Sequence, residues 1–155
     1  MCATFRGSEL LSSKYLILPL VVAALILGGL SSSDAANDIW YLQLNKSNLN
    51  PPGYVFGIVW PILYLLMAIS AYRTFPVSTN LFYLQLFFNA IWSWLFFAFQ
   101  LPMLALICIW LLIFLNFKVN INMYKYDKLS GYLYTPYIVW LLFASYLNLF
   151  IVLNN

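Results

Sequence analysis

The chain has 155 residues, of which 65% are hydrophobic, 20% aromatic and only 7% charged. Soluble domains typically carry about 25% charged residues and are less than half apolar, so this composition excludes an ordinary soluble domain and indicates lipid as the solvent. The seven Lys and Arg residues are spread along the chain without forming a patch, which argues against nucleic-acid binding.

The uncharged stretches predict the membrane spans. The stretch 74–117 would be about twice as long as the hydrocarbon thickness if it formed one helix, so we expect the chain to turn back near Gln100 and Pro102. Barrel strands would alternate apolar and polar residues, which these stretches do not. We therefore predict an all-α fold, a single transmembrane domain built as a five-helix bundle. Its spans are about 15–31, 54–73, 80–99, 103–122 and 133–152.

An odd number of spans places the two termini on opposite sides of the membrane. The basic residues on the N-terminal side are then Arg6, Lys14, Arg73, Lys118, Lys125 and Lys128, and Lys46 is on the other side. The positive-inside rule predicts a cytoplasmic N-terminus in a bacterial cell membrane. The mitochondrial outer membrane is the alternative location in a eukaryote.

The first span has a second interpretation. Arg6 and Lys14 precede its apolar run, and Ser33, Asp34 and Ala35 follow it, as in a secretory signal peptide with a small-residue cleavage site. Cleavage there would leave four helices. The family resemblance described below favours a retained helix.

The connection 32–52 is the one long loop between the predicted spans. It carries Trp40, Tyr41, Lys46 and the pair Pro51-Pro52. Loops of this length are more often functional lids than passive links. The alternative is an interfacial anchor, with the two aromatic rings at the level of the lipid headgroups.

Three predicted helices carry stripes of aromatic and amide side chains at helical spacing. The stripes are Trp60, Tyr64 and Met67; Gln85, Asn89, Trp92 and Phe96; and Tyr137, Trp140, Ala144 and Asn148. Amides at membrane depth normally point into the bundle or a cavity, and a mostly apolar lining with a few polar groups is typical of a small-molecule site. Helix packing alone would produce the same spacing.

Metal and acid–base chemistry are not predicted. Histidine is absent, and Cys2 and Cys108 lie far apart in the chain, so we expect no metal site. The acidic residues lie in termini and loops, which argues against an ion pathway through the bundle.

Three groups of residues carry a family resemblance. They are Trp40-Tyr41, Leu44, Lys46, Asn50-Pro51-Pro52, Val55-Phe56, Trp60 and Leu63-Tyr64; Gln85-Leu86, Asn89, Trp92-Ser93 and Phe96-Phe97; and Pro136-Tyr137, Trp140, Phe143-Ala144 and Leu147-Asn148. In this order and spacing they resemble the translocator proteins, also called tryptophan-rich sensory proteins or peripheral benzodiazepine receptors. The resemblance covers about residues 15–153.

The resemblance implies a five-helix membrane protein that forms a homodimer and has a cavity capped by the first loop. Members bind porphyrins such as protoporphyrin IX and haem, some sterols, and synthetic benzodiazepine-site ligands. Asn89 would be the hydrogen-bond donor to the ligand. The binding residues carried over are Tyr41, Pro51, Trp60, Tyr64, Asn89, Trp92, Trp140 and Ala144.

Several positions depart from the family pattern. Ser47, Leu49 and Pro61 replace the Pro, Trp and Thr that are frequent there, so we expect different lid contacts. The helix end at 147–153 lacks the Tyr and basic residue of the animal cholesterol motif, so sterol binding through that motif is not predicted. Tyr83 and Phe87 are too large for the small-residue dimer contact of some bacterial members.

The leading functional hypothesis is a membrane protein that binds porphyrins or related tetrapyrroles as a sensor, scavenger or carrier, with no obligatory cofactor. Two alternatives stay open. One is a light- and oxygen-dependent porphyrin-degrading enzyme, in which Trp60 and Trp140 would be the catalytic residues. The other is a structural or assembly subunit of a membrane complex without a specific small ligand.

Overall fold

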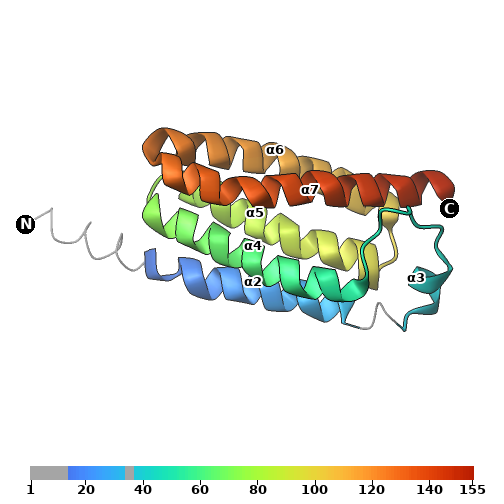
Figure 1. The fold of residues 1–155 in the computed structure, drawn as a ribbon. Helices are drawn as coiled ribbons and strands as arrows, with labels where there is room; N and C mark the ends of the chain where they lie inside the picture. The colour runs from blue at the N-terminus through green and yellow to red at the C-terminus, as the bar shows by residue number, and fades with distance from the viewer. Residues whose placement is uncertain (1–13, 34–36) are drawn as a thin grey trace, which may run out of the picture.

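The computed structural model describes residues 14–33 and 37–155, and this part of the chain is helical and contains no strand. Five apolar helices run side by side, and a short helix lies at the end of the bundle that also holds the C-terminus (Figure 1). The predicted all-α fold is therefore confirmed. Cys2, Arg6, Asp34 and Ala35, named above, lie outside the described residues. The helices are α2 (Ile17–Ser32), α3 (Ile39–Gln43), α4 (Gly53–Arg73), α5 (Thr79–Ser93), α6 (Pro102–Tyr126) and α7 (Lys128–Asn154).

The turn predicted near Gln100 and Pro102 is confirmed. Helix α5 continues into a π-helical turn, Trp94–Ala98. Gln100 then adopts a left-handed conformation with a φ of 55°, and Pro102 begins α6, where its missing N–H is not needed.

The predicted connection between the spans 103–122 and 133–152 is wrong, because α6 and α7 are longer and Asp127 alone separates them. The prediction left 123–132, which contains Lys125, Asp127 and Lys128, outside the spans. Lys125 and Lys128 instead lie within the helices, since a helix can continue past the hydrocarbon layer as long as each added residue forms its backbone hydrogen bond.

Four helical segments are long and apolar enough to cross a membrane: Gly53–Arg73, Thr79–Ala98, Pro102–Tyr126 and Lys128–Asn154. Helix α2 is apolar but shorter, with 16 residues. The outward faces expose large apolar side chains such as Ile62, Phe87 and Trp110, each more than half accessible. Such a surface suits lipid rather than water.

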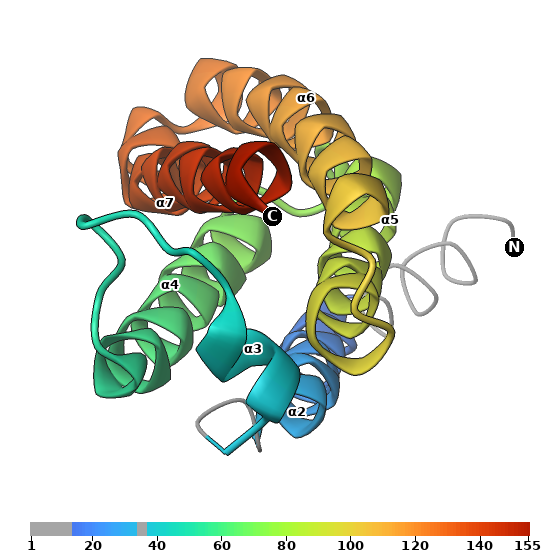
Figure 2. The same ribbon diagram turned by 90° about the vertical axis from the view of Figure 1, so that its right-hand side faces the viewer.

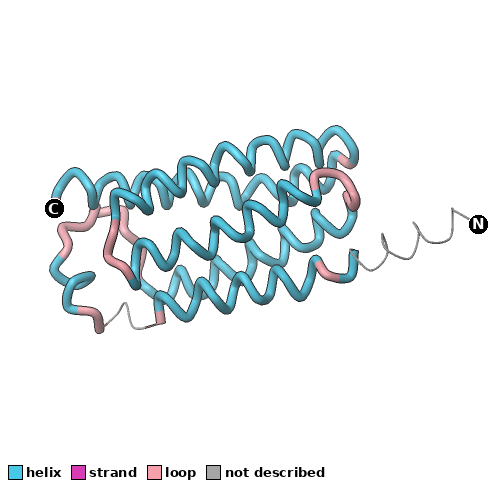
Figure 3. The backbone as a smooth tube through the Cα atoms, turned by 180° about the vertical axis from the view of Figure 1, so that it is seen from behind, coloured by secondary structure: helices cyan, strands magenta, loops and turns pink. Residues whose placement is uncertain are grey.

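The packed core lies where α4, α5, α6 and α7 meet. Met67, Ile109, Leu112 and Leu141 have no measurable exposure there. Seen along the bundle, the helices surround a central axis and α3 lies across the end between α2, α4 and α5 (Figure 2). The view from behind shows the connection containing α3 at one end and the remaining short turns distributed over both ends (Figure 3).

Basic residues gather at the end of the bundle opposite α3. Arg73 closes α4 and forms an ion pair of 2.8 Å with Asp127. The Lys14 ammonium lies 4.1 Å from the centre of the Tyr72 ring. Lys46 lies at the other end of the bundle, the end that carries α3. The predicted topology likewise places Lys46 on the opposite side from these cations.

Candidate ligand-binding cavity

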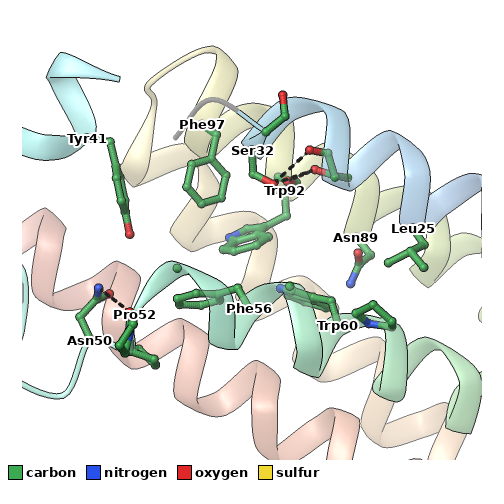
Figure 4. A pocket seen from close by; sticks show the side chains of 18 of the residues that line it. Leu25, Ser32, Tyr41, Asn50, Pro52, Phe56, Trp60, Asn89, Trp92 and Phe97 are labelled. Atoms are coloured by element: carbon green, nitrogen blue, oxygen red, sulfur yellow. Dashed lines mark hydrogen bonds between the residues drawn. The ribbon is translucent and has the colours of Figure 1, made fainter. Parts of the chain in front are cut away.

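A cavity of about 910 Å³ lies beneath α3, between α2, α4 and α5 (Figure 4). This volume is near the upper end of the range for small-molecule sites, about 300–1,000 Å³. The lining comes from four places: the C-terminal half of α2, the connection holding α3, the first half of α4, and the end of α5 with the π-helical turn.

Six of the eight predicted binding residues line this cavity: Tyr41, Pro51, Trp60, Tyr64, Asn89 and Trp92. The structure thus brings together residues from the loop, α4 and α5 that are separated by up to 51 positions in the sequence. Whether they bind a ligand stays a prediction.

Trp140 and Ala144 of α7 are not among the residues that line the cavity in the described chain. The Trp140 ring packs edge-on against Phe56, with the ring centres 5.8 Å apart, and Phe56 does line the cavity. Trp140, which the family resemblance placed in the lining, therefore packs against a lining residue rather than lining the cavity itself.

The rest of the α7 stripe packs against neighbouring helices. Tyr137 is completely buried. The Asn148 amide, oriented to satisfy both of its groups, donates to the Pro102 carbonyl at 2.9 Å and accepts from the Leu106 N–H at 3.1 Å. This side chain therefore joins α7 to the start of α6 through both groups of its amide.

Aromatic faces form the inner wall of the cavity. Trp60 lies 6.3 Å from Trp92, with the ring planes inclined by 39°, and Trp92 stacks on Phe96 at 6.0 Å. Trp60 and Tyr64 are one helical turn apart on α4, and their ring centres are 5.9 Å apart. These rings offer broad apolar surfaces to a flat guest.

A hydrogen-bonded network holds the Asn89 amide at the inner end of the cavity. The Tyr64 hydroxyl donates to the Asn89 side-chain oxygen, and Asn89 Nδ2 donates to the Tyr137 hydroxyl at 2.6 Å. Tyr137 in turn donates to Gln85 Oε1 at 3.0 Å. In the described chain this leaves Asn89 with a second amide hydrogen that has no protein acceptor, so it remains available to a ligand.

Sequence reasoning missed the contribution of α2. Ser93 Oγ donates to the Gly28 carbonyl at 2.9 Å and ties α2 to the end of α5. Trp94 Nε1 donates to the Leu27 carbonyl at 3.0 Å and ties α2 to the π-helical turn. Gly28 and Gly29 line the cavity, and a Cβ at Gly29 would meet nothing within 4 Å. The Gly28-Gly29 pair is the sequence feature that could have indicated this contribution of α2, because two glycines leave part of the helix surface without side chains.

Helix α3 covers the cavity and is held by its N-terminal cap and by two aromatic contacts. The Asp38 carboxylate accepts from the Trp40 N–H at 2.8 Å and caps the helix. The Trp40 ring packs edge-on against Phe96 at 5.9 Å, and Tyr41 packs against Phe97 at 5.6 Å. Both rings of α3 therefore face the bundle, which favours the lid interpretation over the interfacial anchor.

The segment after α3 is fastened to α7. Asn45 N–H donates to Asn155 Oδ1 at 2.8 Å, and Asn155 Nδ2 donates to the Asn45 carbonyl at 3.3 Å. The hydroxyls of Ser47 and Tyr146 are 2.8 Å apart. Ser47, one of the departures from the family pattern, thus supplies a lid contact that proline could not make.

Lys46 lies between these two fastened residues and lines the cavity. Its ammonium is 4.4 Å from the centre of the Tyr41 ring. Burial raises the pKa of the Tyr41 phenol above its ordinary value, and a hydrogen bond with Asn50 opposes this effect. Tyr41 is therefore neutral at physiological pH.

The comparisons with known proteins agree with this architecture. Residues 16–153 match the model of the TspO/MBR family. The chain is 33% identical over 144 residues to the tryptophan-rich protein TspO of Archaeoglobus fulgidus, covering 87% of this chain and 94% of the relative. It is 33% identical to the tryptophan-rich sensory protein of Cereibacter sphaeroides, covering 72% of this chain and 73% of the relative. It is 29% identical to the human translocator protein, covering 70% of each chain.

Proposed function

The chain belongs to the TspO/MBR family, and from this premise we propose that it binds porphyrins and related tetrapyrroles, such as protoporphyrin IX and haem, in the cavity beneath α3. The protein is an integral membrane protein, because it belongs to this family and has four helices that are long and apolar enough to cross a membrane. Its role would be that of a sensor, scavenger or carrier. The name of the Cereibacter sphaeroides relative, tryptophan-rich sensory protein, supports the role of a sensor.

One observation carries the proposal: the cavity joins flat aromatic walls to a single orienting amide. Trp60 and Trp92 present ring surfaces to the same space. Asn89 is 3% exposed at the inner end, and among the described residues only one of its two amide hydrogens has an acceptor, the Tyr137 hydroxyl. A large, flat and mostly apolar molecule with polar atoms in its plane matches both features.

The proposal includes α2 as a fifth membrane span. With 16 residues it is about 24 Å long at 1.5 Å per residue, which a slightly thinned bilayer accommodates. The N-terminal side would then face the cytoplasm of a bacterial cell, where the positive-inside rule places the cations around Arg73. In a eukaryote the mitochondrial outer membrane is the alternative.

The test is a titration of the protein in lipid nanodiscs with protoporphyrin IX, followed by the porphyrin absorbance and corrected with empty nanodiscs. We expect saturable binding that weakens about tenfold in Trp60→Ala, which corresponds to about 1.4 kcal/mol. The matched control is Trp110→Ala, because Trp110 lies on α6 and is 52% exposed on the outer face. This control should leave the affinity unchanged.

Unsaturated uptake that equals uptake by empty nanodiscs would overturn the proposal. It would mean that the porphyrin only partitions into lipid, and the structural-subunit hypothesis would then lead.

A further inference from the structure

We propose that Lys46 is the anchor for an anionic group of the ligand, so that the cavity selects planar amphiphiles carrying a carboxylate at the lid end. This inference rests on the proposed function and deepens it, because it names the chemical class within the ligands considered. Three observations carry it: the position of Lys46, the lack of an acidic partner for Lys46 among the residues that the structure describes, and the uncharged lining of the rest of the cavity.

The backbone of Lys46 is fixed from both sides. Its neighbours Asn45 and Ser47 are each hydrogen-bonded to α7, through Asn155 and Tyr146. The Leu49 N–H also donates to Ser47 Oγ at 3.1 Å, which makes a local turn. A lysine held in this way loses less conformational entropy on binding than one in a free loop.

The positive charge of Lys46 is not neutralised in the described part of the chain. Its ammonium rests on the neutral Tyr41 ring at 4.4 Å, a contact that leaves its N–H groups able to donate. The side-chain carboxylates described are those of Asp38 and Asp127. Asp38 accepts from the α3 backbone and, at 3.3 Å, from Gln100 Nε2, and Asp127 pairs with Arg73 at the other end of the bundle.

The other residues that line the cavity in the described chain are uncharged. Aromatic rings and glycines make up much of its walls. Asn89 is at the inner end (Figure 4), and Lys46 is at the lid end, with its ammonium over the ring of Tyr41 on α3. A ligand that fits this polarity has an apolar planar body against Trp60 and Trp92 and an acid group beside Lys46. Lys46 is half-buried, and an ion pair formed with a partly buried ammonium is stronger than one at an open surface.

The experiment compares protoporphyrin IX, which carries two carboxylates, with its neutral dimethyl ester in nanodiscs. We expect the wild type to bind the acid at least tenfold more tightly than the ester after correction for uptake by empty nanodiscs. Lys46→Met should remove this preference by weakening the acid alone, and Lys46→Arg should keep it. Lys118→Met is the matched control, because the Lys118 ammonium also lies over a ring, that of Phe114 at 4.3 Å, but does not line the cavity.

The possible results separate this inference from the proposed function. Saturable binding with equal affinity for acid and ester would overturn the anchor role and leave porphyrin binding intact. A loss of both ligands in Lys46→Met would also overturn it, because it would show that the side chain only positions the lid. The absence of saturable binding for either compound would overturn the proposed function, and the inference with it.

Discussion

The hydroxyl of Tyr64 donates a hydrogen bond to the side-chain oxygen of Asn89, and this contact joins α4 to α5 at the inner end of the cavity. Both side chains are buried, with exposures of 3% each. The amide that faces the cavity is thus held by the protein before any ligand enters, which reduces the cost of binding.

Tyr64→Phe should destabilise the fold. It removes the donor and leaves a buried amide oxygen without its partner, which costs about 1 kcal/mol or more. Thermal unfolding in detergent would measure the lowered midpoint. Tyr54→Phe is the matched control, because Tyr54 is 71% exposed and should unfold like the wild type. Equal midpoints for the two variants would contradict the structural role of this hydrogen bond.

Gly131→Ala should destabilise the contact between α6 and α7. A Cβ at Gly131 would lie 2.6 Å from Tyr124 Cβ and 2.8 Å from Tyr124 Cα, and the backbone atom cannot move aside. Forcing the helices apart costs about 1–3 kcal/mol. The same thermal unfolding assay measures the effect, and a midpoint equal to that of the wild type would show that the helices adapt freely.

Gly57→Leu should block ligand binding while preserving the fold. Gly57 lines the cavity, and a Cβ there would meet nothing within 4 Å. The larger side chain would occupy ligand space, and leucine also favours the helix by up to about 1 kcal/mol over glycine. We expect at least a tenfold loss of porphyrin affinity without a lower unfolding midpoint. Retained affinity would place the ligand elsewhere.

Asn155→Ala should loosen the lid. It removes both side-chain hydrogen bonds to the Asn45 backbone, worth together about 1 kcal/mol at an exposed site, so trypsin should cleave after Lys46 about fivefold faster. Asn154→Ala is the control, because its side chain bonds within α7, to the Phe150 carbonyl at 2.7 Å. Equal cleavage rates for all three proteins would mean that other contacts hold the lid.

Asp127→Asn should cost stability in a pH-dependent manner. A hydrogen bond from Ser130 and the nearby Arg73 guanidinium hold the pKa of Asp127 below its ordinary value. Its carboxylate therefore stabilises the fold above about pH 4, and this contribution disappears as the pH falls through the folded-state pKa. The difference in unfolding midpoint between wild type and variant should be constant from pH 7 to 5 and shrink by pH 3.

Ser130→Ala provides the internal check on this pH effect. It removes the 2.6 Å hydrogen bond to Asp127, so the stabilisation should disappear at a higher pH than in the wild type. A midpoint difference between wild type and Asp127→Asn that stays the same at pH 7 and pH 3 would contradict the role assigned to this carboxylate.

Local properties of the sequence determined the helices and part of the cavity. Uncharged length predicts where an apolar helix runs, because rise per residue and hydrocarbon thickness are constant. Helical spacing likewise put Trp60 and Tyr64 on one face of α4, and Asn89 and Trp92 on one face of α5. Those four residues line the cavity as their spacing suggested.

Only the tertiary structure decided which faces meet. Spacing on α7 could not reveal that Phe56 stands between Trp140 and the cavity, because that depends on how α4 and α7 pack. Nor could it reveal that Asn45 and Asn155, 110 positions apart, fasten the lid and fix Lys46 at its edge. Periodicity orients a side chain about its own helix axis, whereas its neighbours are set by the packing of whole helices, to which residues distant in the chain contribute.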